Sequence, residues 1–80
     1  MQAKTAIRIR GQDYVLTRDD IIRLARANQP DPIKTYYVEV LGKNYPPKQL
    51  VRAATGTRKP FDSANARSAL TKLGFIVKAV

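Results

Sequence analysis

Two short segments near the amino end alternate or group apolar residues in the way that half-buried strands do. In residues 6–10, Ile7 and Ile9 alternate with Arg8 and Arg10, and after a turn at residues 11–13 the chain continues with an apolar run at 14–16. A period of two with β-branched residues is typical of a strand that has one face in the core. The pattern predicts a β-hairpin or strand pair.

A helix is expected directly after this pair. Thr17 followed by Asp20 resembles a capping box with Asp in place of Glu. Apolar residues then recur at helical spacing and predict a helix from residue 18 to about residue 27. The proline-rich loop 28–32 ends it, because each proline removes a hydrogen-bond donor and pushes its predecessor out of helical geometry. This loop separates two halves of one domain.

The second half of the chain repeats the order of strand, turn and helix. Residues 34–40 alternate and are rich in aromatic and β-branched residues, so we expect a strand, followed by a tight turn at 41–44. Pro46 or Pro47 suits the first position of a helix, where the missing N–H has no consequence. Gly56 is a natural stop for that helix.

The last part of the chain predicts one more helix and one more strand. Asp62 or Ser63 caps a helix whose apolar residues repeat at helical spacing until Gly74 ends it. Residues 75–80 alternate and suit a final strand. We therefore expect residues 1–80 to form a single α+β domain, in which about three short helices pack on a small, mainly antiparallel sheet.

Two segments of the sequence resemble each other. IRIRGQDY and VEVLGKNY share a strand pattern, a glycine turn and a tyrosine, and each precedes a predicted helix. A duplicated strand–turn–helix unit explains this echo. The general similarity of alternating strands and amphipathic helices explains it equally well, and the sequence leaves both interpretations open.

Net charge changes the picture from fold to function. Fifteen Lys and Arg stand against six Asp and Glu, which gives a net charge of +9 and a pI near 10.4. This excess predicts a polyanionic partner, most often nucleic acid and less often an anionic membrane. No run approaches the roughly 18 apolar residues of a membrane span, and MQAKTAIRIRG is too short and too interrupted by arginine for a signal peptide. A cytoplasmic location without a membrane partner is expected.

Composition argues against catalysis. The chain has no Cys and no His, which excludes disulfides and thiolate metal sites and removes the usual general base. The six carboxylates are scattered, apart from Asp19 and Asp20 at a predicted helix start. No nucleophile is paired with a base and no Gly-rich phosphate loop is present. We expect a binding module, not an enzyme, with no cofactor and no metal.

Positive charge is concentrated between residues 43 and 72, where a single acid occurs. Lys48 and Arg52 are four residues apart and share one face of a predicted helix. Each cation alone is an ordinary surface side chain, but several on adjoining elements can each meet a phosphate and release its counterions. Arg8 and Arg10 extend this patch only if their strand lies on the same side of the molecule, which the sequence does not determine. The candidate DNA-binding residues are Lys43, Tyr45, Pro46, Lys48, Arg52, Arg58, Lys59, Arg67 and Lys72.

The stretch Tyr45-Pro46-Pro47 comes just before the amino end of a predicted helix, where free N–H groups and the helix dipole attract anions. In a functional interpretation, the proline and tyrosine side chains form a shallow apolar wall beside a phosphate position, and Lys48 supplies charge. In a structural interpretation, Tyr45 packs in the core and the prolines only start the helix.

The pattern GKNYPPK at residues 42–48, followed by LV at 50–51, AA at 53–54, FDS at 61–63 and LTKLGF at 70–75, resembles the sulfur-binding domains. These domains precede HNH nuclease domains in some modification-dependent restriction endonucleases of restriction–modification systems, and they bind phosphorothioate DNA. The resemblance covers about half the chain. Its most specific parts are YPPK and the closing LTKLGF.

The resemblance implies that Tyr45 and Pro46 face the sulfur and that Lys43 and Lys48 contact phosphates. At the position after this last lysine, where family members often have a small apolar residue, the chain has Gln49. A cationic residue expected upstream of the motif is not assigned. The available candidates for it are Arg18, Arg23 and Arg26.

Two other classes of partner are compatible with the charge. An RNA-binding or ribosome-associated protein would use Tyr36, Tyr37 and Phe61 to stack on unpaired bases. A protein-interaction or accessory module would turn its basic face to an acidic protein. We favour duplex DNA over RNA, and the oligomeric state is not determined by the sequence.

Overall fold

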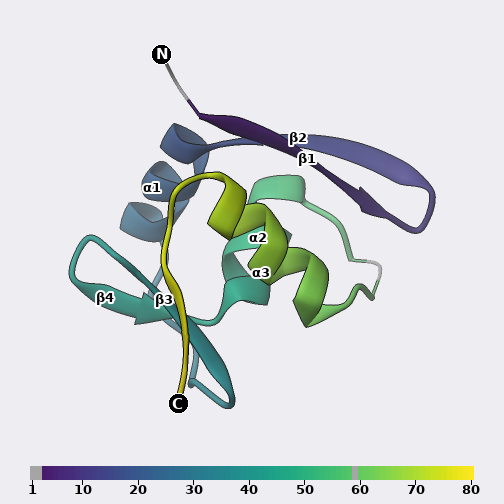
Figure 1. Cartoon of the computed structure of the whole chain (residues 1–80). Helices are drawn as coiled ribbons and strands as arrows, with labels where there is room; N and C mark the ends of the chain where they lie inside the picture. Colours follow the sequence, from purple (N-terminus) through teal and green to yellow (C-terminus); the bar gives the residue numbers. More distant parts are fainter. Residues whose placement is uncertain (1–2, 59) are drawn as a thin grey trace.

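The chain folds as two β-hairpins, each followed by a helix, and a third helix that leads into a last strand (Figure 1). The computed structural model describes residues 3–58 and 60–80. The fold is α+β, as the sequence predicted. The elements in chain order are β1 (Lys4–Ile9), β2 (Gln12–Thr17), α1 (Arg18–Ala27), β3 (Tyr36–Val40), β4 (Lys43–Tyr45), α2 (Pro47–Thr55), α3 (Ser63–Lys72) and β5 (Val77–Ala79).

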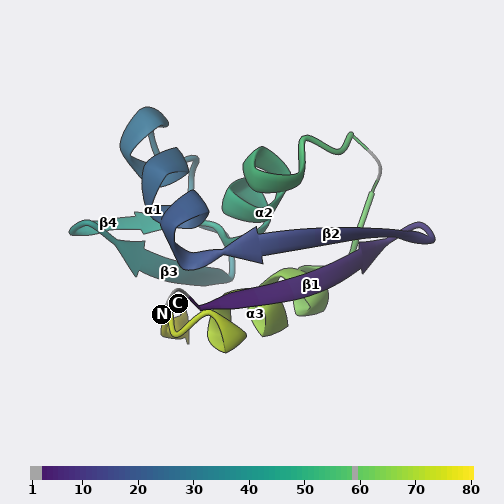
Figure 2. The same ribbon diagram turned by 90° about the horizontal axis from the view of Figure 1, so that it is seen from above.

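The strands form two separate antiparallel sheets in place of the single sheet that we expected. β1 pairs with β2 alone, whereas β3 is the central strand between β4 and β5. α2 and α3 contact both sheets, and the view from above shows the first hairpin running across the molecule with α2 on one side of it and α3 on the other (Figure 2). The two hairpins do not join into one sheet, because α2 and α3 pack between them.

Both hairpins close through two-residue turns whose residues all have positive φ. The angles are 52° at Arg10 and 82° at Gly11 in the first turn, and 55° at Leu41 and 78° at Gly42 in the second. Such turns match the twist of the strands that they connect. The second turn needs only two residues. Strand β4 therefore begins at residue 43, although we expected residues 43 and 44 to belong to the turn.

The helix boundaries follow local signals. Helix α1 covers the predicted residues, and the Thr17 hydroxyl accepts a hydrogen bond from the backbone N–H of Asp20 at its start. Pro47 is the first residue of α2, and Gly56 ends this helix with φ 69° and an N–H that donates to the Arg52 carbonyl. Asp62 is the N-cap of α3, without a side-chain hydrogen bond.

All elements except β5 contribute fully buried side chains to one apolar core. The alternation of β1 and β2 turns Ile7, Ile9 and Leu16 inward, as predicted, and the apolar stripes of the three helices meet them. The other buried apolar residues are Ile21, Ala25, Val38, Val40, Tyr45, Leu50, Val51, Phe61, Ala66, Ala69, Leu70, Leu73 and Phe75.

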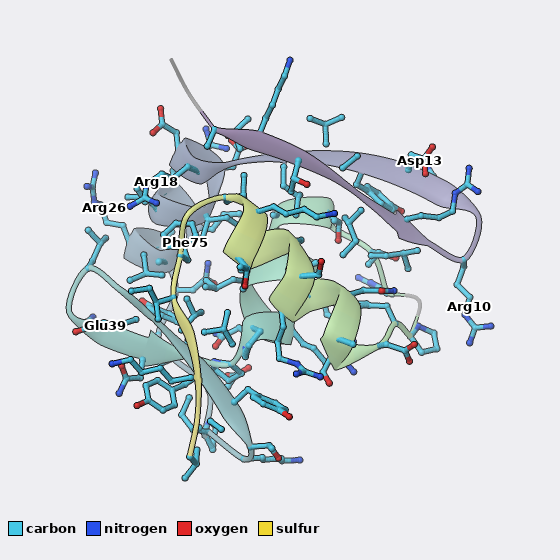
Figure 3. The ribbon with its side chains drawn as sticks, in the orientation of Figure 1. Arg10, Asp13, Arg18, Arg26, Glu39 and Phe75 are labelled. Carbon is cyan, nitrogen blue, oxygen red and sulfur yellow. The ribbon has the colours of Figure 1, made fainter. Side chains whose placement is uncertain are left out.

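The side chain of Arg18, the first residue of α1, caps the carboxyl end of α3. Its Nη1 donates to the Leu73 carbonyl at 3.1 Å, and its guanidinium carbon lies 4.5 Å from the centre of the Phe75 ring (Figure 3). A Cβ at Gly74, where φ is 92°, would lie 2.8 Å from Nη1. The glycine therefore serves both the backbone conformation and the approach of the arginine.

Comparing Gly74→Ala with Gly11→Ala separates these two effects. Both glycines have positive φ, but a Cβ at Gly11 meets no atom within 4 Å. We expect Gly11→Ala to lower the free energy of unfolding by about 1 kcal/mol from backbone strain. Gly74→Ala should lose about 1 kcal/mol more, because the arginine is displaced from its carbonyl. Urea unfolding measures both, and an Arg18→Ala background should remove the difference; equal losses in the original chain would contradict this role of Arg18.

Candidate nucleic-acid interface

A groove of about 520 Å³ lies between the amino end of α2, strand β3 and the proline-rich loop. Its surface is mainly apolar, although three cations, Lys34, Lys48 and Arg52, line it. The fold thus brings three of the predicted residues, Pro46, Lys48 and Arg52, together in this groove. We call this feature the proline groove and define it by Asp31, Lys34, Tyr36, Pro46, Pro47, Lys48 and Arg52.

Two cations of α2 converge on one aromatic ring beside the groove. Lys48 Nζ lies 5.3 Å and the Arg52 guanidinium carbon 5.4 Å from the centre of the Phe61 ring. The ring attracts both cations, while like charges four residues apart on a helix repel each other. In the described part of the chain, the carboxylates that form ion pairs are those of Asp13 and Asp20, with other arginines. An anion that approached this pair would relieve its repulsion.

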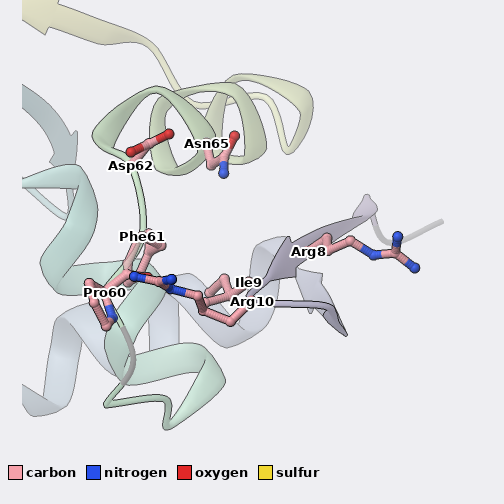
Figure 4. Close-up of a pocket in the computed structure, with 7 residues that line it drawn as sticks. All are labelled: Arg8, Ile9, Arg10, Pro60, Phe61, Asp62 and Asn65. Carbon is pink, nitrogen blue, oxygen red and sulfur yellow. The ribbon is translucent and has the colours of Figure 1, made fainter.

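The first hairpin delivers a third cation to the same region. Arg10 lies in the β1–β2 turn, and its Nε donates to the Pro60 carbonyl at 3.4 Å (Figure 4). Arg10 and Phe61 line one shallow pocket of about 290 Å³. Arg8 points away from this loop in the close-up, and its Nε donates to Asp13 at 2.9 Å. Both arginines that the sequence left unplaced thus line this pocket, but Arg10 reaches the Pro60 loop, whereas Arg8 is paired with Asp13.

Arg67 of α3 lies flat on the ring of Tyr36. Its guanidinium carbon is 3.9 Å from the ring centre, and its buried Nε has no hydrogen-bond partner within the described residues. Tyr36 lines the proline groove. Arg67 therefore fixes this ring at the groove and contributes its charge nearby.

Three other predicted residues within the described part of the chain do not line the groove. Lys43 is exposed at the start of β4, and Lys72 lines a separate depression between β1 and α3. Arg58 is exposed in the loop between α2 and α3. Lys59 lies outside the described residues.

Tyr45 is buried, and the prediction that it faces a ligand is wrong. Its side chain is 1% exposed, and its single hydroxyl proton is shared between the carbonyls of Ala25 and, at 3.0 Å, Asn28. Pairing with Val38 across the β3–β4 hairpin turns the ring toward the core. The structural interpretation of Tyr45 is confirmed, and the apolar wall of the groove consists of prolines without it.

Gln49 holds the loop that forms one wall of the groove. Its Oε1 accepts from the backbone N–H of Asp31 at 2.8 Å, and its Nε2 donates to the Gln29 carbonyl at 2.8 Å. Sequence reasoning singled out Gln49 only as a departure from a family pattern and did not consider Asp31 as a site residue. One signal in the sequence could have indicated this role of Gln49. It is a long amide side chain in the first turn of a helix, and the preceding loop is rich in prolines, which leave few backbone hydrogen-bond donors.

The candidates for an upstream cationic residue lie on α1. Arg18 is engaged with the end of α3, and Arg23 donates to Asp20 at 2.8 Å. Arg26 is exposed in the last turn of α1. Figure 3 shows Arg18 and Arg26 on the opposite side of the molecule from Arg10. None of the three lines the proline groove.

No protein-family model, curated protein or solved structure matches the chain. The resemblance to sulfur-binding domains therefore rests on the motif residues and stays a prediction. Within residues 3–58 and 60–80, no helix has the length and apolar character needed to cross a membrane. The same residues contain no cluster of three or more carboxylates that could hold a metal ion.

Tyr45→Phe tests the structural role of the buried hydroxyl. The substitution leaves two carbonyls at the end of α1 without this donor, so we expect the free energy of unfolding to fall by about 1–3 kcal/mol. Tyr14→Phe is the matched control, because the Tyr14 hydroxyl makes no hydrogen bond to the described residues, and it should change stability little. Chemical denaturation measures both. A Tyr45→Phe protein of unchanged stability that no longer bound DNA would return this residue to the interface.

Proposed function

We propose that this protein binds duplex DNA through a basic face formed by Arg10, Lys48, Arg52 and Arg58. The observation that carries the proposal is the pair of cations, Lys48 and Arg52, held over Phe61 without a carboxylate partner among the described residues. Arg10 reaches the same region from the hairpin turn, and Arg58 is exposed in the α2–α3 loop. The net charge of +9 adds a long-range attraction to any polyanion.

The form of this face suits a phosphate backbone. Its cations come from three different segments, so they can meet successive phosphates, and release of counterions supplies affinity that does not depend on base sequence. The proposal includes a cytoplasmic location and no catalytic activity.

Duplex DNA is preferred over single-stranded RNA because the exposed aromatic platforms that single strands need are largely occupied. Phe61 is 9% exposed beneath two cations, Arg67 covers one face of the Tyr36 ring, and Tyr37 is half-buried. Open stacking of successive bases requires uncovered aromatic faces. Recognition through the backbone does not.

We further propose a preference for a phosphorothioate backbone, as in the restriction–modification proteins that the motif resembles. Half-buried Pro46 forms an apolar wall next to Lys48 at the groove. Sulfur is larger, softer and less hydrated than oxygen, so an apolar wall beside a cation favours it. In this proposal Pro46 takes the role that the sequence had shared between Pro46 and Tyr45.

Lys48→Ala and Arg52→Ala test the basic face. Each should weaken binding to a plain duplex and reduce the slope of log affinity against log salt by about 0.9, the value for one lost phosphate contact. Arg23→Ala is the control, because Arg23 is paired with Asp20 outside this face. Fluorescence anisotropy at several salt concentrations gives the slopes. If Arg23→Ala changed the slope as much as the other two, net charge alone would account for binding.

Pro46→Ser tests the apolar wall. We expect the original protein to bind one stereoisomer of a single phosphorothioate more tightly than the plain duplex, with the ratio of affinities maintained as salt rises. Pro46 is the N-cap of α2, where serine is favourable, so the substitution removes the apolar ring while keeping the helix start. It should abolish the preference and leave affinity for the plain duplex unchanged, whereas Pro60→Ser should retain both. Identical affinity of the original protein for the plain duplex and for both phosphorothioate stereoisomers would reject the sulfur preference and leave general DNA binding.

A further inference from the structure

The proline groove contains one carboxylate among its cations. Asp31 lines it and forms no ion pair within the described part of the chain. Its backbone is held in place, because prolines flank it on both sides and its N–H donates to Gln49 Oε1, and its side chain is exposed at the groove. A site for phosphate alone gains nothing from a carboxylate in its wall, since like charges repel. The carboxylate indicates a ligand that also carries hydrogen-bond donors.

The size and walls of the groove indicate a ligand with a flat apolar body, which would lie between the cations and Asp31. Its volume of about 520 Å³ is far larger than a phosphate group needs and lies in the range of roughly 300–1,000 Å³ that is typical of small-ligand sites. Half-buried Pro46 and exposed Pro32 supply rigid apolar surface, and Arg67 fixes the ring of Tyr36. A ligand with an anionic end, a flat body and a hydrogen-bond-donating edge is a nucleotide.

We propose that the proline groove accepts an extrahelical guanylate of the bound nucleic acid, with its phosphate near Lys48 and Arg52 and its base paired to Asp31. A carboxylate accepts hydrogen bonds at two oxygens and donates none. Guanine presents two adjacent donors, N1–H and the 2-amino group, on its Watson–Crick edge. Adenine and cytosine place one donor beside a ring acceptor, and thymine and uracil place one donor between two carbonyls. Bidentate pairing therefore selects guanine.

The nucleic-acid part of this inference rests on the proposed function. Taking a base out of a duplex requires unstacking and unpairing, and this is easiest for a base that is already unpaired. A bulged or mismatched guanine is thus the natural occupant. The basic face holds the backbone on either side of it.

The first experiment tests the groove without DNA. Amide NMR shifts of ¹⁵N-labelled protein are followed during titration with GMP and with IMP, which lacks the 2-amino group. We expect shifts at Asp31 and Tyr36 and about tenfold tighter binding of GMP, the effect of one hydrogen bond to a charged group. Asp31→Asn should remove the difference, whereas Asp62→Asn, at an exposed acid that does not line the groove, should keep it. Equal affinities, absent shifts at these amides, or a preference that survives Asp31→Asn would overturn the inference.

The second experiment separates this inference from the proposed function. Duplexes with one bulged guanine, one bulged inosine or no bulge are compared at a single salt concentration, and the guanine bulge should bind about tenfold more tightly than the inosine bulge. Equal binding of all three duplexes would reject the extrahelical guanine and leave duplex binding intact. Selective binding of free GMP by a protein that binds no duplex would reject both the proposed function and the nucleic-acid part of this inference.

Discussion

The groove depends on the way that two side chains, Tyr45 and Gln49, hold the proline-rich loop against the start of α2. The last carbonyls of a helix have no partner within the helix, and α1 ends where this loop begins. The Tyr45 hydroxyl bonds to the carbonyls of Ala25 and Asn28 at this end. The Gln49 amide bonds to the backbone of the loop, at the Gln29 carbonyl and the Asp31 N–H. In the sequence, Pro46 and Pro47 lie between Tyr45 and Gln49, and prolines have no backbone N–H that needs a hydrogen-bond partner. The YPPKQ stretch thus joins α1, its loop and α2 into one unit.

The fold also sorts the charges. Arg8 and Arg23 meet carboxylates, and Arg18 meets the end of α3, so these cations act within the molecule. Around the start of α2, the cations have apolar and aromatic neighbours instead. The cations around the start of α2 have no carboxylate partner among the described residues, so their charge is available to attract a polyanion.

Features set by near neighbours in the sequence were predictable, and features set by distant contacts were not. The α1 boundaries, the Pro47 start of α2 and its end at Gly56 follow from side-chain and backbone preferences within a few residues. The division into two sheets could not be read from the sequence, because it depends on where α2 and α3 pack. Tyr45 gave a misleading signal for the same reason, since its hydroxyl partner at Ala25 is 20 residues away. Lys48 and Arg52 could be placed together from the sequence because of their helical spacing, and Pro46 because it directly precedes the same helix.

The attachment of the loop by Gln49 has a consequence for how such a protein can diversify. The loop wall is held by hydrogen bonds from one surface amide to the backbone, and backbone groups are present whatever the side chains are. Residues on this wall can therefore be exchanged over evolutionary time without repacking the core. A lineage that keeps Gln49 and Tyr45 can change the chemistry of the groove by replacing a single loop side chain, while its basic face and its stability are inherited unchanged.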